Sequence, residues 1–190
     1  MKTIILSSLI IFALFTNTKE GFAQDKVNEE EKIVLQEQEL LDGKVKIGTP
    51  ENWRYLSPRI KRMTFPQYRQ ADVVSMIDAS AYLVAQHSIE PLENGDVAVL
   101  NEQIKKNLAT EFEDIVYLKN DVANINEQKI SYYECLVEEK SSYILQFYTN
   151  VEGCMLEVRI KAKVKKKSEE EIKAFRKLAS QMMESLIIVN

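Results

Sequence analysis

Apolar and polar residues alternate along the second half of the chain, as they do in strands with one covered face. Between residues 154 and 164 every second residue is apolar or cysteine, and Arg159 and Lys161 lie among the residues between. Largely apolar runs at 129–137 and 143–150 predict two further strands. This pattern is typical of an antiparallel sheet with one buried face and one solvated face.

The predicted domain opens with a β-hairpin. Extended runs at 33–41 and 44–49 flank Asp42 and Gly43. A short Asp-Gly connection is a strong hairpin signal, because both turn positions can take positive φ values. Pro50 has no amide hydrogen to donate, so it ends the second strand.

Two helices are predicted from apolar residues that recur three and four positions apart. The apolar stripe of the first consists of Val97, Leu100, Ile104, Leu108 and Phe112. The second follows a capping box, in which the Ser168 hydroxyl accepts a hydrogen bond from the amide of Glu171. Its buried stripe consists of Ile172, Phe175, Leu178, Met182 and Leu186.

Further extended runs complete the predicted sheet. They lie at 71–77 and 80–89, joined at Asp78 and Ala79, and at 115–118 as a short strand. The predicted fold class is α+β, an α/β/α sandwich. It contains a largely antiparallel sheet of about six to seven strands, covered by two main helices.

The start of the chain predicts a signal peptide at 1–23. A lysine precedes an apolar run of about 12 residues, and small residues precede the expected cleavage site after Ala23. A helix needs roughly 20 apolar residues to span a bilayer, so we prefer a cleaved signal to an uncleaved membrane anchor. Residues 24–32 then form a charged leader, and residues 33–190 form a single domain. The mature chain is expected to be periplasmic or secreted, without a transmembrane segment.

The charge balance argues against nonspecific nucleic-acid binding. The formal charge of −4 becomes −5 once residues 1–23 are removed. Nonspecific binding needs a positive face that replaces the counterions around phosphates. We therefore expect no nucleic-acid partner.

Two cysteines, Cys135 and Cys154, would enter an oxidising compartment, where a disulfide is permitted. The predicted strand at 143–150 separates the two strands that carry them. Strand spacing alone then places their Cα atoms about 10 Å or more apart, beyond the roughly 7 Å limit for a disulfide. We expect two buried free thiols.

Catalytic and metal-binding signatures are weak in this sequence. His87 is the single histidine, and its place in an apolar strand predicts a core or rim residue rather than a ligand or a base. A carboxylate pair remains open, because Asp72, Asp78, Glu134 and Glu138 could meet in space. Charged residues that alternate with apolar ones are nevertheless typical of a solvated strand face. We expect no cofactor and no metal site.

The basic run 159–167 has two interpretations. It could bind an anionic surface, or its lysines could blunt edge-to-edge pairing of an exposed strand. Glu169 to Glu171 follow at once and compensate the charge. We prefer the second interpretation.

The segment 52–71 is the predicted partner-binding surface. It contains five basic residues and no acidic residue, and it interleaves them with aromatic side chains. Aromatic and arginine side chains dominate protein interfaces. In the alternative interpretation the segment is a long connection whose aromatics enter the core while its arginines stay in water. Trp53 is expected to be a buried anchor rather than a contact. The candidate binding residues are Arg54, Tyr55, Arg59, Lys61, Arg62, Tyr68 and Arg69.

The order of these elements resembles the PsbP-like family. The opening hairpin with the sequence GKVKIGTPENW, and the last helix leading into SLIIV, are similar to the start and close of such domains. The resemblance implies an α/β/α sandwich around an antiparallel sheet. PsbP-like domains are mostly non-enzymatic partners, among them a photosystem II extrinsic subunit, a Ran-binding import factor and exported bacterial proteins. The resemblance transfers no site residue, because the family has no common active site.

We therefore expect an exported, non-enzymatic interaction protein that binds a protein partner in the periplasm. A sharper form of this hypothesis is an immunity protein that neutralises a secreted antibacterial type VI toxin. The alternative from another class is a hydrolase that uses a carboxylate cluster or His87.

Overall fold

The computed structural model describes most of the predicted domain. The described ranges are 33–92, 97–139, 141–164 and 168–189. The predicted signal peptide and the charged leader lie outside the described residues. In the described part of the chain, no helix has both the length and the apolar character that a membrane span requires.

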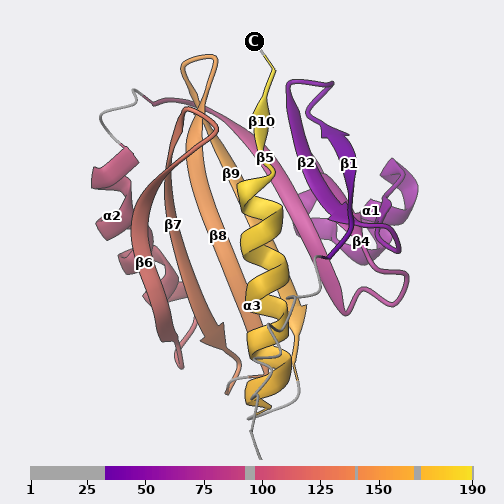
Figure 1. The fold of residues 1–190 in the computed structure, drawn as a ribbon, viewed down its shortest axis with the longest axis vertical. Coiled ribbons are helices and arrows are strands. Elements are labelled where there is room, and N and C mark those ends of the chain that lie inside the picture. Colours follow the sequence, from indigo (N-terminus) through magenta and orange to yellow (C-terminus); the bar gives the residue numbers. More distant parts are fainter. Residues whose placement is uncertain (1–32, 93–96, 140, 165–167, 190) are drawn as a thin grey trace, which may run out of the picture. The chain divides into compact units, whose positions relative to one another are not determined.

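A seven-stranded antiparallel sheet forms the middle layer of residues 33–190 (Figure 1). In spatial order its strands are β3 (Arg54–Tyr55), β4 (Asp72–Ser75), β5 (Ala81–Pro91), β9 (Cys154–Lys163), β8 (Ser142–Val151), β7 (Gln128–Val137) and β6 (Val116–Ile125). Every neighbouring pair is antiparallel. The strands predicted in the second half of the chain are confirmed, and so is the α+β class.

One face of this sheet lies under α3 (Glu169–Glu184) and a small separate sheet. The small sheet orders its strands as β1 (Leu35–Leu40), β2 (Val45–Pro50) and β10 (Ile187–Ile188). Fully buried side chains from both layers, such as Ile47, Phe147 and Met182, form the main core here. The capping box is confirmed in part, because the Ser168 hydroxyl accepts from the Glu171 amide at 3.4 Å.

The opening hairpin is confirmed, with all six residues of β1 paired to β2. Its turn contains three residues with positive φ values, Leu41 at 54°, Asp42 at 57° and Gly43 at 84°. The hairpin pairs with β10 and does not join the seven-stranded sheet. It therefore acts as part of the cover, packed on the sheet beside α3 (Figure 1).

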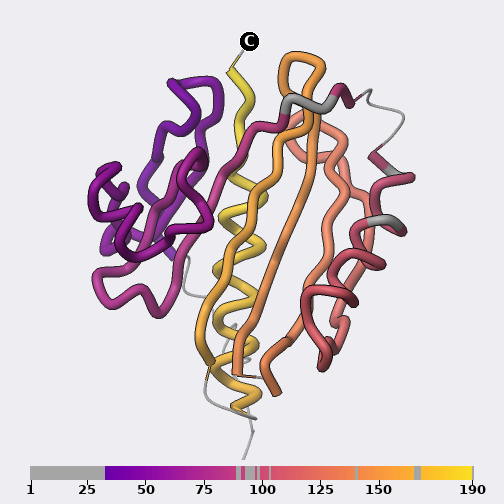
Figure 2. The backbone as a smooth tube through the Cα atoms, turned by 180° about the vertical axis from the view of Figure 1, so that it is seen from behind, coloured from indigo at the N-terminus to yellow at the C-terminus, as the bar shows by residue number. Residues whose placement is uncertain are grey.

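Two separate helical segments cover the opposite face (Figure 2). Helix α2 (Val97–Glu111) packs on β6, β7 and β8, and its side chains Ile104 and Leu108 are buried. Helix α1 (Pro58–Thr64) and the 3₁₀ helix η1 (Pro66–Tyr68) belong to the segment that covers β4 and β5. The predicted solvated face of 154–164 is therefore wrong in its middle, where Glu157 and Arg159 are only partly exposed.

Strand β6 is longer than predicted, with ten residues in place of the short strand at 115–118. Its pairing with β7 contains a register shift between Tyr117 and Lys119. Most of its side chains are exposed or half-buried, so the strand shows no clean alternation. Three polar residues at 119–121 interrupt the apolar pattern on which strand prediction depends.

The two cysteines are free thiols, as expected, and β8 lies between their strands. Cys135 is fully buried beneath α2, where burial raises the pKa of its thiol to about 12. The prediction that both are buried is wrong for Cys154, which is partly exposed at the start of β9.

Candidate functional site

The segment between β2 and β4 is fastened to the sheet by backbone and side-chain contacts. Trp53 is 5% exposed and belongs to the main core, which agrees with its predicted role as an anchor. Its amide donates to the Pro50 carbonyl at 2.9 Å, and the Leu56 amide donates to Val73 at 2.9 Å. The chain therefore leaves the hairpin, pairs briefly as β3 and enters α1 with little freedom.

Helix α1 makes the predicted loop more regular than expected. Pro58 occupies its first turn, where the missing amide hydrogen costs nothing, and the helix ends at Thr64, two residues before Pro66. Lys61 is 8% exposed, and its ammonium group donates to the Ala71 carbonyl. Lys61 therefore does not lie on a surface that a partner can reach, contrary to the prediction.

Tyr68 also serves the fold. Its ring lies 6.4 Å from the rings of Phe65 and Tyr82, and those two rings lie 4.7 Å apart in an edge-on arrangement. The Tyr68 hydroxyl accepts a hydrogen bond from Arg159 at 3.3 Å. Tyr68 is thus a half-buried packing residue, and its predicted contact with a partner stays a prediction.

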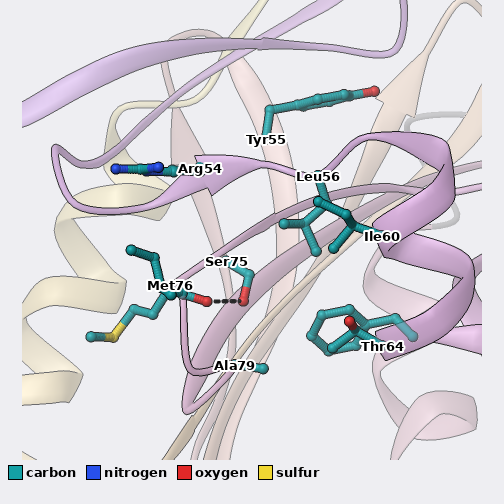
Figure 3. Close-up of a pocket in the computed structure, with 10 residues that line it drawn as sticks. Arg54, Tyr55, Leu56, Ile60, Thr64, Ser75, Met76 and Ala79 are labelled. Atoms are coloured by element: carbon teal, nitrogen blue, oxygen red, sulfur yellow. Dashed lines mark hydrogen bonds between the residues drawn. The ribbon is translucent and has the colours of Figure 1, made fainter.

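An apolar pocket of about 290 Å³ lies between β3, α1 and the turn that joins β4 to β5 (Figure 3). We call it the α1 pocket. Its walls include Tyr55, Leu56, Ile60, Phe65, Met76 and Ile77. Arg54 lies at one end of the pocket, and Ile60 and Thr64 of α1 lie at the other (Figure 3).

Three large apolar residues that line the α1 pocket are exposed to water. Tyr55 is 46% exposed, Ile60 is 51% exposed and Ile77 is 82% exposed. Met63, 77% exposed, follows on the same helix. Single exposed apolar residues are ordinary, whereas a group of them around a cavity marks an interaction site.

Tyr55 is held in place by a polar link to the opening hairpin. Its hydroxyl donates to Asp72 at 2.5 Å, and the other carboxylate oxygen of Asp72 accepts from the Leu41 amide at 2.6 Å. Desolvation, together with the neighbouring Asp72, raises the pKa of Tyr55 to about 12. The ring is therefore a fixed wall of the pocket at neutral pH.

Four exposed arginines lie in the segment that carries α1 and η1, and Arg54 among them lines the α1 pocket. The other three are Arg59 and Arg62 on α1 and Arg69 after η1. Within the described residues, none of the four forms an ion pair or a side-chain hydrogen bond. The turn that joins β4 to β5 contains Asp78, whose carboxylate accepts from the Ser80 hydroxyl and amide. These bonds lower the pKa of Asp78 and keep it ionised.

The other two arginines of the chain are paired with carboxylates. Arg176 on α3 donates to the buried Glu134 at 2.5 Å. Arg159 on β9 donates to both oxygens of Glu111 at 3.0 and 3.2 Å, and to Gln146 at 2.6 Å. With Glu157, which accepts from Gln146, these residues form what we call the Arg159 cluster.

The other predicted catalytic candidates do not gather in one place. His87 is half-buried, with Nε2 3.1 Å from the Val151 carbonyl, so it is a rim residue with a partner. Glu134 contacts Arg176, and Glu138 contacts Lys161 and Ser142. Asp72 and Asp78 make the local contacts described above. In the described ranges, no group of three His, Cys, Asp or Glu side chains could hold a metal ion.

Sequence reasoning found one side of the α1 pocket and missed the other. The arginines and Tyr55 were predicted, whereas Met76 and Ile77 in the β4–β5 turn were not. A usable signal was Ile77 itself, an apolar residue directly before the predicted turn at Asp78. The Arg159 cluster was also missed, because its residues alternate like solvated ones.

Comparison with known proteins identifies the fold. The sequence matches no protein-family model and no curated protein. The cyanobacterial PsbP protein (CyanoP) of Synechocystis is similar in structure, with a TM-score of 0.57 at 11% identity over 85% of this chain and 96% of that one. LpqN of Mycobacterium tuberculosis has a TM-score of 0.54 at 12% identity over 82% and 92%. The chain has the PsbP-like fold. At this identity the likeness concerns the fold alone, as the sequence resemblance implied.

Proposed function

We propose that this chain is an exported, non-enzymatic protein that binds a protein partner through the α1 pocket and its arginines. The observation that carries the proposal is the combination of an open apolar pocket with four exposed arginines that have no side-chain partner in the part of the chain that the structure describes. A side chain that stabilised only the fold would be expected to have such a partner, as Arg159 and Arg176 do.

Burial of the exposed pocket walls supplies a driving force for association. Full burial of one large aliphatic side chain contributes about 1.5 to 3 kcal/mol. Ile60 and Ile77 are at least half exposed, so each retains much of this gain for a partner. Isoleucine and tyrosine at the pocket form the apolar centre, and the arginines form the polar rim that interfaces commonly have.

Two observations support an extracytoplasmic location. The start of the sequence has the features of a signal peptide. LpqN, which shares the fold, is described as involved in cell envelope biogenesis. We infer action in the periplasm, where the mature protein would meet its partner.

The proposal is tested by affinity capture with matched baits made from the mature chain. The first variant, Arg59→Glu/Arg62→Glu, reverses two charges on α1, the helix that forms one end of the pocket. The control, Lys106→Glu/Lys173→Glu, makes the same change of charge on exposed positions of α2 and α3. A partner that binds the α1 pocket is captured by the wild type and by the control but is lost with the first variant. Equal capture by all three baits would refute the proposed surface.

Folding of these variants is checked before capture. Arg59, Arg62, Lys106 and Lys173 are exposed and have no side-chain partner among the described residues. Each change is expected to alter the free energy of unfolding by less than about 0.5 kcal/mol. Circular dichroism and fluorescence of Trp53 report the melting temperature.

The immunity-protein form of this hypothesis stays a prediction. A toxin gene directly upstream, together with rescue of cells from that toxin by the mature protein, would support it.

The absence of enzymatic activity also stays a prediction, and a screen with chromogenic glycoside and ester substrates tests the hydrolase alternative. Activity abolished by Glu134→Gln or His87→Ala would overturn the non-enzymatic proposal.

A further inference from the structure

The size of the α1 pocket indicates what fills it. Its volume of about 290 Å³ lies at the lower end of the range for small-molecule sites, which is about 300 to 1,000 Å³. The space therefore suits one large side chain better than a whole cofactor-sized molecule. Its walls are aliphatic or aromatic, which favours a leucine-, methionine- or phenylalanine-like group.

The charge around the α1 pocket indicates what flanks that side chain. Arg54 comes from β3 at one end of the pocket, while Arg59 and Arg62 come from α1 at the other end. Arg59 and Arg62 are three residues apart on α1, so they lie on the same exposed side of the helix. Unpaired guanidinium groups bind carboxylates well, because two parallel hydrogen bonds form with each.

We infer that the partner presents an acidic peptide segment with one large apolar side chain. The apolar side chain fills the α1 pocket, and carboxylates on either side of it contact Arg54, Arg59 and Arg62. This inference rests on the proposed function and adds the chemistry of the partner. A basic partner is disfavoured, because it would have to approach four arginines that form no ion pair within the described residues.

The test is a selection from a displayed library of random 16-residue peptides. The library is panned in parallel on the mature wild-type protein, on Arg59→Glu/Arg62→Glu and on Ile77→Ser. The matched control for the last variant is Ile187→Ser, an exposed isoleucine on β10. The expected wild-type-specific peptides contain Asp or Glu on both sides of one large apolar residue.

Affinity measurements then separate the two parts of the contact. For the best peptide, Arg59→Glu/Arg62→Glu is expected to weaken binding at least tenfold, and Ile77→Ser by about threefold to tenfold. Ile187→Ser and Lys106→Glu/Lys173→Glu should leave the affinity unchanged. Raising NaCl from about 50 to 300 mM should weaken binding several-fold, because exposed charges are screened.

Three results would overturn the inference. They are enrichment of neutral or basic peptides, equal enrichment on the wild type and both pocket variants, and no enrichment at all. Binding to phosphatidylglycerol vesicles or to oligo(dT), lost in the same variants while no acidic peptide is selected, would assign the arginines to another class of ligand. If affinity capture still depends on Arg59 and Arg62 but the peptides carry no acid, the proposed function stands and this inference fails. If the wild type and Arg59→Glu/Arg62→Glu capture the partner equally well, the proposed function itself fails.

Discussion

Arginine side chains have opposite surroundings in two regions on the same side of the seven-stranded sheet. In the Arg159 cluster, beside α2, the Arg159 side chain is 14% exposed and donates to Glu111, Gln146 and Tyr68. Around the α1 pocket, Arg59 and Arg62 are exposed and have no side-chain partner in the described residues. The first region uses arginine to join elements of the fold, and the second leaves it open to solvent.

The role of each arginine therefore depends on whether an oxygen atom inside the fold already accepts hydrogen bonds from its guanidinium group. A guanidinium group that already binds carboxylate and amide oxygens inside the fold gains little from a ligand and loses its existing bonds. An unpaired one on the surface loses only hydration. The apolar neighbours agree with this difference, because Ile104 and Leu108 beside the Arg159 cluster are buried, whereas Ile60 and Ile77 at the α1 pocket are exposed.

The largest expected effect comes from removing the paired arginine. Arg159→Met keeps much of the side-chain length but leaves Gln146, which is 2% exposed, and Glu157 without the guanidinium group. We expect a loss of about 3 kcal/mol in the free energy of unfolding and a fall of roughly 10 °C in melting temperature. Urea titration followed by Trp53 fluorescence measures the loss.

The matched change on the other region is Arg59→Met. Its guanidinium group has no described partner, so the free energy of unfolding should change by less than about 0.5 kcal/mol. Similar losses for Arg159→Met and Arg59→Met would remove the distinction between the two regions.

The next largest effect distinguishes Lys61 from Arg62, two neighbouring basic residues of α1. Lys61→Met removes the donor to the Ala71 carbonyl beneath the helix, at a position that is 8% exposed. We expect a loss of about 1 kcal/mol in stability and no change in partner affinity. Arg62→Met, one position along, should do the reverse, with stability unchanged and affinity lower. Calorimetric titration with the selected peptide, beside thermal unfolding, distinguishes the two patterns.

A smaller effect is expected at the contact that joins the two regions. Tyr68→Phe removes the hydroxyl that accepts from Arg159 at 3.3 Å and leaves the ring in its aromatic cluster. Because this hydrogen bond is long, we expect a loss of about 0.5 kcal/mol and unchanged binding. A clear loss of affinity would show that the Arg159 cluster positions the α1 segment for its partner, and that the two regions are not independent.

The sequence predicted those parts of the fold that local patterns determine. Strict alternation located β9, and three- and four-residue spacing with Ser168 as the cap located α3. The Asp42-Gly43 turn located the opening hairpin. Each of these patterns depends on neighbouring residues alone. It can therefore be recognised in the sequence without knowing which segments pack on the element.

The parts that failed depend on contacts between distant segments. Glu157 and Arg159 alternate with apolar residues as solvated side chains do, yet α2 and η1 approach them from other parts of the chain. In the sequence, Lys61 is one basic residue among several arginines. Only the folded structure shows that its ammonium group donates to the Ala71 carbonyl. The α1 pocket combines segments around residues 55, 60 and 77, which no sequence spacing relates.

The last prediction concerns the pH dependence of stability at the Arg159 cluster. Burial raises the pKa of Glu157, and Arg159 opposes this shift while Glu111 adds to it. A carboxyl group whose pKa is higher in the folded state stabilises the fold when it is protonated. This contribution is complete below the ordinary glutamate pKa of about 4.3, and it is lost as the pH rises through the raised value.

Glu157→Gln imitates the protonated form, so its stability relative to the wild type should depend on pH. The variant should be slightly more stable than the wild type near pH 8, and the difference should shrink toward zero as the pH falls to about 4. Urea titrations at several pH values measure this difference, with Glu102→Gln, the same substitution at an exposed position on α2, as the control. A difference that stayed constant with pH would mean that Glu157 is solvated like the residues around the α1 pocket. The contrast between the two regions would then rest on the hydrogen bonds of Arg159 alone.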